Sequence, residues 1–96
     1  MYMIEVRQTV HFRTWVADLD VQARARVEVR IRRLSLGNFG DAKFFDGIGE
    51  LRIDFGLGYR VYFVKKGNAL VILLAGGNKK TQRRDIRDAI EMAKEV

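Results

Sequence analysis

The pattern of apolar positions in the first part of the chain predicts a strand followed by a helix. Residues 3–7 alternate briefly between apolar and polar side chains, which is typical of a short strand. Thr9 is a residue type that caps helices, and the apolar side chains after it recur at the spacing of one helix face. We therefore expect a helix with a buried stripe made of Phe12, Trp15, Val16 and Leu19.

The next segment carries two conflicting patterns. Residues 21–32 alternate apolar and polar at period two, as a strand does. However, Gln, Ala, Arg and Glu are good helix formers, and strands are usually only about 5–6 residues long. We expect a helix that ends at Gly37. Such a helix needs two neighbours, the sheet and either the first helix or another protein, because its apolar residues form two nearly opposite stripes: Ala23, Val27, Ile31 and Leu34, and Val21, Ala25 and Val29.

The pattern in the second half of the chain predicts strands separated by glycines. Residues 50–55 alternate strictly, which places Glu50, Arg52 and Asp54 on one face and the apolar residues between them on the other. Gly56 and Gly58 indicate a turn, after which residues 59–65 return as a second strand. A hairpin centred on Leu57 would place Asp54 opposite Arg60, and Arg52 opposite Tyr62, on one surface.

The last two elements complete the fold prediction. Residues 69–75 are continuously apolar, as in a strand that is buried on both faces. Residues 85–96 predict a helix whose inward side chains are Ile86, Ala89, Ile90 and Ala93. The predicted order is βααβββα, an α+β fold, and 96 residues are enough for a single domain that spans residues 1–96.

Composition narrows the chemistry that is available. The chain has no cysteine and a single histidine, His11, so disulfides, thiol catalysis, histidine-based triads and zinc clusters are excluded. Eighteen Lys and Arg against twelve Asp and Glu give a net charge of +6, which favours a polyanion, an acidic protein or an anionic membrane surface as partner. No apolar run approaches the ~20 residues of a membrane span. The N-terminus lacks the pattern of a signal peptide, so we expect a cytoplasmic protein that does not enter a membrane.

A set of residues spread over nearly the whole chain matches a known pattern. Its most specific part is the run ELRIDFG at residues 50–56 followed by GYRVYF at residues 58–63. The other matching positions are Phe12, Trp15, Leu19, Arg26, Ile31, Arg33, Leu34, Gly37, Asn38, Gly40, Asp41, Gly49, residues 70–74 and 76–79, Gln82, Arg84, Asp85 and Ile86. With these residues the chain resembles the RelE/ParE superfamily of toxins from type II toxin–antitoxin modules, and more narrowly its addiction-module killer or HigB-type subfamily.

The resemblance implies a fold and a chemistry. It implies a twisted antiparallel sheet with the two N-terminal helices on one face, a C-terminal helix, and a working surface on the opposite, concave face. Ribonuclease members of the superfamily cut mRNA on the ribosome without metal or cofactor, and a cognate antitoxin neutralises them. The implied reaction is attack by a ribose 2′-hydroxyl on the neighbouring phosphodiester. Preplaced cations stabilise its anionic transition state, and proton transfers complete it.

The resemblance also indicates catalytic residues. Arg52 lies where the family places an arginine that contacts phosphate, and a guanidinium can hold two phosphate oxygens. The alternative is a solvated arginine that pairs with Asp54 or Glu50. Arg60 shares that surface, although a structural pair with Asp54 is the competing interpretation. The other catalytic candidates are Lys79 and Lys80, near the leaving group, and Asp85, or Glu50, as a base that replaces the tyrosine or histidine present in the C-terminal helix of several relatives.

Further positions are candidates for RNA and protein contacts. Lys43 and Tyr62 are candidate RNA-binding residues, although strand aromatics are usually part of the core. A stripe of Arg26, Arg30 and Arg33 suits ribosomal RNA or is simply a solvated helix face. The side made of Val21, Ala25 and Val29 suits an antitoxin, or packs against the first helix.

The sequence thus predicts the toxin of a toxin–antitoxin module, acting as a ribosome-dependent endoribonuclease. Two alternatives stay open on the same fold. One is a ParE-type inhibitor of DNA gyrase, and the other is a non-catalytic relative that binds antitoxin and regulatory operator DNA. The basic charge fits all three.

Overall fold

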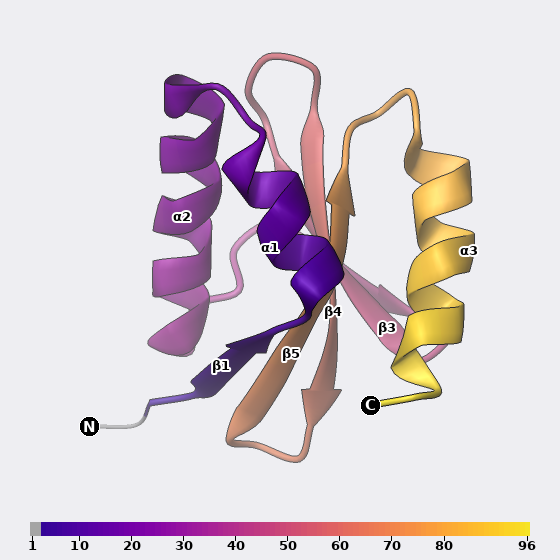
Figure 1. Cartoon of the computed structure of the whole chain (residues 1–96). Helices are drawn as coiled ribbons and strands as arrows, with labels where there is room; N and C mark the ends of the chain where they lie inside the picture. The colour runs from indigo at the N-terminus through magenta and orange to yellow at the C-terminus, as the bar shows by residue number, and fades with distance from the viewer. Residues whose placement is uncertain (1–2) are drawn as a thin grey trace.

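The computed structural model describes residues 3–96 and contains three helices and five strands in that range (Figure 1). The order is βααββββα, with one strand more than the sequence pattern predicts. The additional strand is β2, whose two phenylalanines follow each other and so hide the alternation of a strand. In chain order the elements are β1 (Glu5–Gln8), α1 (Val10–Ala17), α2 (Val21–Ser35), β2 (Ala42–Phe45), β3 (Ile48–Ile53), β4 (Tyr59–Lys66), β5 (Leu70–Gly77) and α3 (Gln82–Ala93).

The strands form one mixed sheet in the order β1-β5-β4-β3-β2. Strands β2 to β5 are antiparallel neighbours, whereas β1 pairs with β5 in parallel, so the sheet is not antiparallel throughout. The helices α1 and α2 carry the chain from the β1 edge to the β2 edge, and the following meander returns to β1 (Figure 1). The α+β class predicted from the sequence is confirmed.

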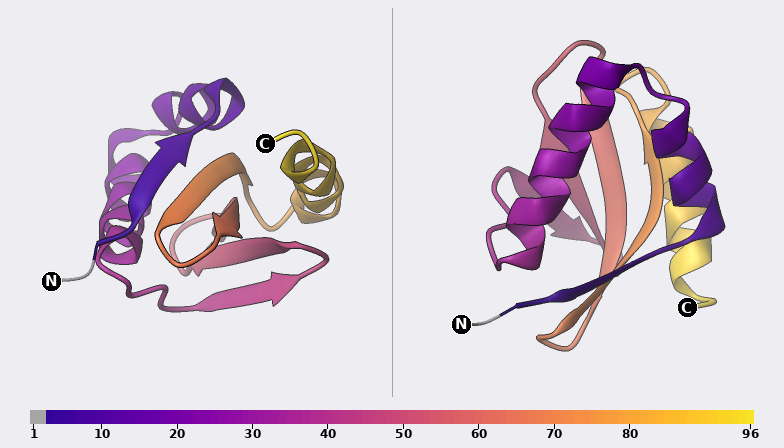
Figure 2. Two further views of the ribbon diagram at one scale, coloured as in Figure 1. Left: turned by 90° about the horizontal axis from the view of Figure 1, so that it is seen from below. Right: turned by 60° about the vertical axis from the view of Figure 1, so that its left-hand side comes forward.

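Helices cover both faces of the sheet. On one face, α1 and α2 contribute Phe12, Val27 and Leu34 to a core that includes Leu51 and Leu73 of the strands. On the other face α3 packs through Ala89. Figure 2 shows the strongly curved sheet with the α1–α2 pair and α3 on different sides. Strand β5 is buried on both faces, as its continuous apolar sequence predicts.

The second helix is confirmed, and its two apolar stripes have different environments. Asp20 caps the helix by accepting a hydrogen bond from the backbone N–H of Ala23, and this local signal outweighs the strand-like alternation. Ala23, Val27 and Leu34 are buried, whereas Val21 is 73% and Val29 is 47% exposed. Helix α1 therefore does not cover the outer stripe, and Val29 at its end borders a hollow that Phe55 also lines.

The β3–β4 hairpin differs from the predicted register by two residues. The pairs are Glu50 with Tyr62, and Arg52 with Arg60, so the hairpin is centred on Gly56 rather than Leu57. Strand β3 ends at Ile53, and residues 54–58 form the loop, in which Gly56 and Gly58 have positive φ angles of 56° and 73°. The predicted cross-strand pair of Asp54 and Arg60 is therefore wrong. Two arginines face each other instead.

Candidate active site

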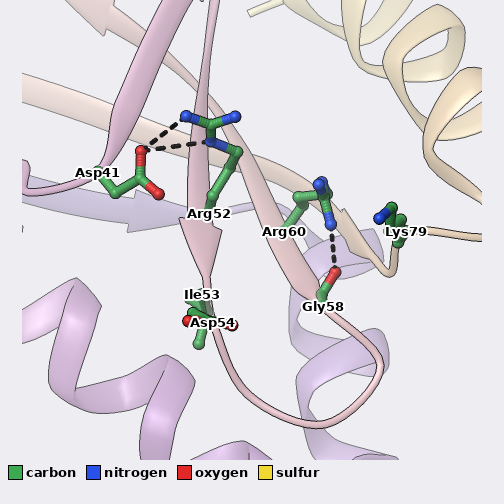
Figure 3. Close-up of a pocket in the computed structure, with 7 residues that line it drawn as sticks. All are labelled: Asp41, Arg52, Ile53, Asp54, Gly58, Arg60 and Lys79. Atoms are coloured by element: carbon green, nitrogen blue, oxygen red, sulfur yellow. Dashed lines mark hydrogen bonds and ion pairs between the residues drawn. The ribbon is translucent and has the colours of Figure 1, made fainter.

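A cleft of about 370 Å³ lies where the ends of β3 and β4 meet the turn after β5 (Figure 3). It brings together three predicted catalytic residues that are distant in sequence, Arg52, Arg60 and Lys79. Because Arg52 and Arg60 are directly opposite in the register, their side chains leave the same face of the sheet, the face on which α3 packs. The remaining lining residues are Asp41, Ile53, Asp54 and Gly58.

Arg52 is held by a carboxylate that precedes β2. Its Nη2 and Nε atoms lie 2.9 and 3.3 Å from Oδ1 of Asp41. Neither Asp54 nor Glu50, the partners considered from the sequence, makes this pair. The Arg52 side chain is 36% exposed. An ion pair with this much contact with water contributes little stability. Asp41 therefore orients the guanidinium while leaving it accessible to a stronger anionic ligand such as a phosphate.

Arg60 is much more enclosed. Its Nη1 atom donates a hydrogen bond of 2.6 Å to the carbonyl oxygen of Gly58, and its side chain is only 13% exposed. Its nearest carboxylate is that of Glu50, with 3.8 Å between Nε of Arg60 and Oε2 of Glu50. The counterion of Arg60 is thus a buried strand residue and not Asp54.

Lys79 is presented by a turn that is fixed from two sides. Oδ1 of Asn78 accepts hydrogen bonds from the backbone N–H groups of Lys80 and Thr81. The backbone N–H of Lys79 donates to the carbonyl oxygen of Leu57, which ties this turn to the β3–β4 loop. The Lys79 side chain is exposed, and it makes no ion pair within the described part of the chain. Lys80 lines an adjoining hollow beside Lys79 rather than the cleft itself.

The two carboxylates considered as bases are both buried. Asp85 is 8% exposed, accepts a hydrogen bond from Oγ1 of Thr81, and packs so closely on Gly77 that a side chain there would collide with it. Asp85 does not line the cleft, and its contacts with Thr81 and Gly77 are structural ones. Glu50 is 2% exposed and is equally inaccessible as a base.

Tyr62, predicted to bind RNA, is fully buried on β4, so its ring has no exposed face on which a base could stack. Its ring packs in the core under α3, and its hydroxyl donates a hydrogen bond of 3.0 Å to Oε2 of Glu50. Burial raises the pKa of Tyr62 above its usual value, and the negative charge of Glu50 raises it further. The hydroxyl consequently stays protonated and acts as a donor.

The three arginines of the predicted α2 stripe have different roles. Arg30 donates hydrogen bonds to the backbone carbonyl oxygens of Arg52, Phe39 and Asp41, and its burial lowers its pKa. This arginine therefore tethers α2 to the segment before β2 and is not free to bind RNA. Arg26 and Arg33 are exposed beside a second hollow of about 200 Å³, where the Arg26 guanidinium lies 4.6 Å from the centre of the Phe55 ring.

The remaining predicted RNA-binding residue, Lys43, is exposed on the edge strand β2. It is opposite Glu50 in the register and so lies on the same face as the cleft, but outside its lining. The sequence interpretation assigned neither Asp41 nor Gly58 to the catalytic site. Asp41 is brought to Arg52 by strand β2, which the hydrophobic pattern did not reveal, and Gly58 was recognised only as a turn residue.

Comparison with known proteins places the chain in a family. The sequence profile described as "Phage derived protein Gp49-like (DUF891)" matches residues 14–96. The chain belongs to the Gp49-like family. This phage-derived family is toxin-like and of the RelE/HigB type found in toxin–antitoxin modules, so the resemblance is confirmed at that level. Among relatives of this Gp49-like chain, an uncharacterized protein of Haemophilus influenzae is 48% identical over 95 residues, which cover 97% of this chain and 96% of the relative.

Two further observations bear on the chemistry of this Gp49-like protein. Across residues 3–96, no cluster of three or more His, Cys, Asp or Glu side chains is arranged to hold a metal ion. In the same range, no helix is long and apolar enough to span a membrane.

The tether formed by Arg30 predicts a stability difference between neighbouring arginines. Arg30→Ala removes hydrogen bonds to three backbone carbonyl oxygens, of which that of Asp41 also accepts from the backbone N–H of Arg52, and it should lower the free energy of unfolding by about 1–3 kcal/mol. Arg33→Ala, on the exposed face of the same helix, should change it by less than about 0.5 kcal/mol. Urea unfolding followed by circular dichroism measures both. Equal stability of the two variants would contradict the tether.

The raised pKa of Tyr62 predicts a stability loss at alkaline pH. The unfolded tyrosine ionises near pH 10 while the folded one keeps its proton, so the stabilisation is complete below pH 10 and is lost above it. Tyr62→Phe removes this linkage. The slope of unfolding free energy against pH between about 10.5 and 11.5 should then become shallower by about 1.4 kcal/mol per pH unit. Tyr59→Phe is the matched control, and identical slopes for wild type and Tyr62→Phe would refute the assignment.

Proposed function

We propose that this chain is the toxin of a type II toxin–antitoxin module and acts in the cytoplasm as a metal-independent, ribosome-dependent endoribonuclease on mRNA. The observation that carries the proposal is the pair of arginines that face each other across β3 and β4. Like charges directly opposite in a sheet are destabilising. Here they line one cleft together with Lys79. A bound phosphate would relieve this repulsion.

The cleft supplies the main requirements of 2′-hydroxyl attack on a phosphodiester. Arg52 is the accessible guanidinium, and it can exchange its weak pair with Asp41 for two oxygens of the scissile phosphate. Arg60 adds a fixed second charge for the oxyanion that develops in the transition state. Lys79, whose side chain is exposed at the cleft, would donate a proton to the leaving 5′-oxygen.

A proton acceptor for the 2′-hydroxyl completes the proposed mechanism. Glu50 and Asp85 are buried, and Asp41 is paired with Arg52. Asp54 also lines the cleft, is exposed, and has no ion pair among residues 3–96. We assign the acceptor role to Asp54, which lies beyond the end of β3 and is not opposite Arg60 in the register.

The proposed partners follow from charge and from the uncovered face of α2. The net charge of +6 suits an acidic antitoxin as well as mRNA and the ribosome. The exposed residues Val21, Ala25 and Val29 form an apolar strip on α2, which α1 does not cover. We assign this strip to the antitoxin, through which the complex would reach operator DNA.

Removal of Arg52 should abolish mRNA cleavage. When the wild-type protein is induced without antitoxin, primer extension on cellular mRNA should show new 5′ ends. Arg52→Ala should reduce their yield by about 10²–10³-fold, the usual effect of removing one donor to a transition-state oxyanion. Asp54→Asn should reduce the yield without weakening binding to RNA.

Arg7→Ala is the matched control, because Arg7 forms a similar exposed pair with Glu5 on a strand distant from the cleft. Growth arrest without new 5′ ends, accompanied by a DNA-damage response, would contradict the ribonuclease function and indicate a gyrase inhibitor. Absence of arrest would indicate a non-catalytic, antitoxin-binding protein.

Charges placed on the outer strip of α2 should weaken antitoxin binding. Ala25→Glu and Val29→Glu each put a carboxylate on this face, and calorimetric titration with the cognate antitoxin should show at least about tenfold weaker affinity. Val10→Glu, at a 68% exposed position on α1, is the control that changes charge and apolar area elsewhere. If both α2 variants fold and bind like the wild type, the antitoxin does not use this strip.

A further inference from the structure

A single carboxylate oxygen beneath the cleft connects three side chains. Oε2 of Glu50 accepts hydrogen bonds of 3.0 Å from the Tyr62 hydroxyl and 2.9 Å from Nε2 of Gln82, and it lies 3.8 Å from Nε of Arg60. These partners come from β4 and from the first residue of α3. Glu50 thus sits where the sheet, the helix and the cleft meet.

The burial of Glu50 requires an explanation, because it is 2% exposed. A buried carboxylate is costly unless its charge is compensated. Tyr62 and Gln82 donate hydrogen bonds but carry no positive charge. Within residues 3–96, Arg60 is the one cation at ion-pair distance from Glu50. Arg60 is therefore the described group that can compensate the carboxylate charge.

The guanidinium of Arg60 is held at two points. Glu50 attracts it at Nε, a buried atom that has no hydrogen-bond partner among the described residues, while the carbonyl oxygen of Gly58 accepts from Nη1. Gly58 has a φ of +73°, and a Cβ atom there would lie 3.1 Å from Nη1, so the loop lies directly against the guanidinium. A long side chain that is free in solution has to lose rotamer entropy on ordering. Here that ordering precedes any ligand.

We propose that Glu50 is a positioning residue that holds the Arg60 guanidinium in the orientation in which it meets a phosphate in the cleft. Gln82 extends the same control to α3, because its amide fixes the carboxylate from the helix side. The effect that this proposal predicts on RNA cleavage rests on the proposed ribonuclease function. Its structural part, the ordering of Arg60 by Glu50, applies to any anion that binds in the cleft.

A double-mutant cycle tests whether Glu50 acts through Arg60. Glu50→Gln keeps the shape of the side chain and removes its charge. In cleavage of ribosome-bound mRNA, we expect it to lower kcat by about 10–100-fold with KM changed less than about threefold, since the lost interaction matters in the transition state. In an Arg60→Ala background the same change should have no further effect, because Glu50 then has no guanidinium to position. Glu5→Gln, which removes an exposed carboxylate, should leave kcat unchanged.

A second measurement separates this inference from the proposed function. In ¹⁵N NMR spectra, the buried Nε–H of Arg60 should exchange slowly with solvent in the wild type and at least about tenfold faster in Glu50→Gln. If Glu50→Gln does not fold, Gln82→Met, which removes one donor and leaves the charge in place, should give a smaller increase in the same direction.

The outcomes distinguish the two ideas. If the wild type does not cut RNA but the Arg60 signal depends on Glu50, the ribonuclease function fails and the positioning role stands. The positioning role is overturned by a different result. In that result the wild type cuts RNA, the fold-losses in kcat of Glu50→Gln and Arg60→Ala multiply in the double variant, and the exchange rate of the Arg60 Nε–H is the same in wild type and Glu50→Gln.

Discussion

The pairing of β3 with β4 is the constraint on which the candidate site depends. In this register Arg52 faces Arg60, and Glu50 faces Tyr62 one pair further along the same face. The apolar side chains between them are on the opposite face, where Leu51 and Ile53 enter the core beneath α1 and α2. Because side chains alternate between faces, a slip of one residue would bury the charges and expose the core. The hydrophobic core thus fixes the position of the cations.

Three carboxylates fix the positions of Arg52, Arg60 and Lys79. Asp41 orients Arg52 at the surface, Glu50 compensates Arg60 in the interior, and Asp85 braces the turn that presents Lys79. Their different burial gives them different roles. The exposed pair can open for a ligand, while the buried contacts keep their geometry because breaking them would leave an unpaired buried group.

The family and the fold limit the function without selecting it. The Gp49-like family is toxin-like and of the RelE/HigB type, and the α+β architecture is compatible with that fold. One fold can support unrelated activities, so the choice among them has to come from the site. The ribonuclease proposal depends on the three cations in one cleft, and the antitoxin proposal depends on the exposed apolar strip on α2.

The sequence by itself determined what depends on neighbours along the chain. The cap at Thr9, the stripe that buries Phe12, and the apolar run of β5 all act over a few residues, so the first helix and this strand could be predicted.

Only the tertiary structure decided which distant groups meet. The partner of Arg52 is eleven positions away, on the segment before a strand that the pattern did not reveal, and Glu50 meets Gln82 across thirty-two positions. The register of the hairpin depends on how its loop packs. In this register Tyr62 is in the core, and Asp54 lines the cleft without a cross-strand partner in the β3–β4 pairing. Local propensity carries no information on such contacts, because the energy of an ion pair or a buried hydrogen bond depends on the geometry that the whole fold imposes.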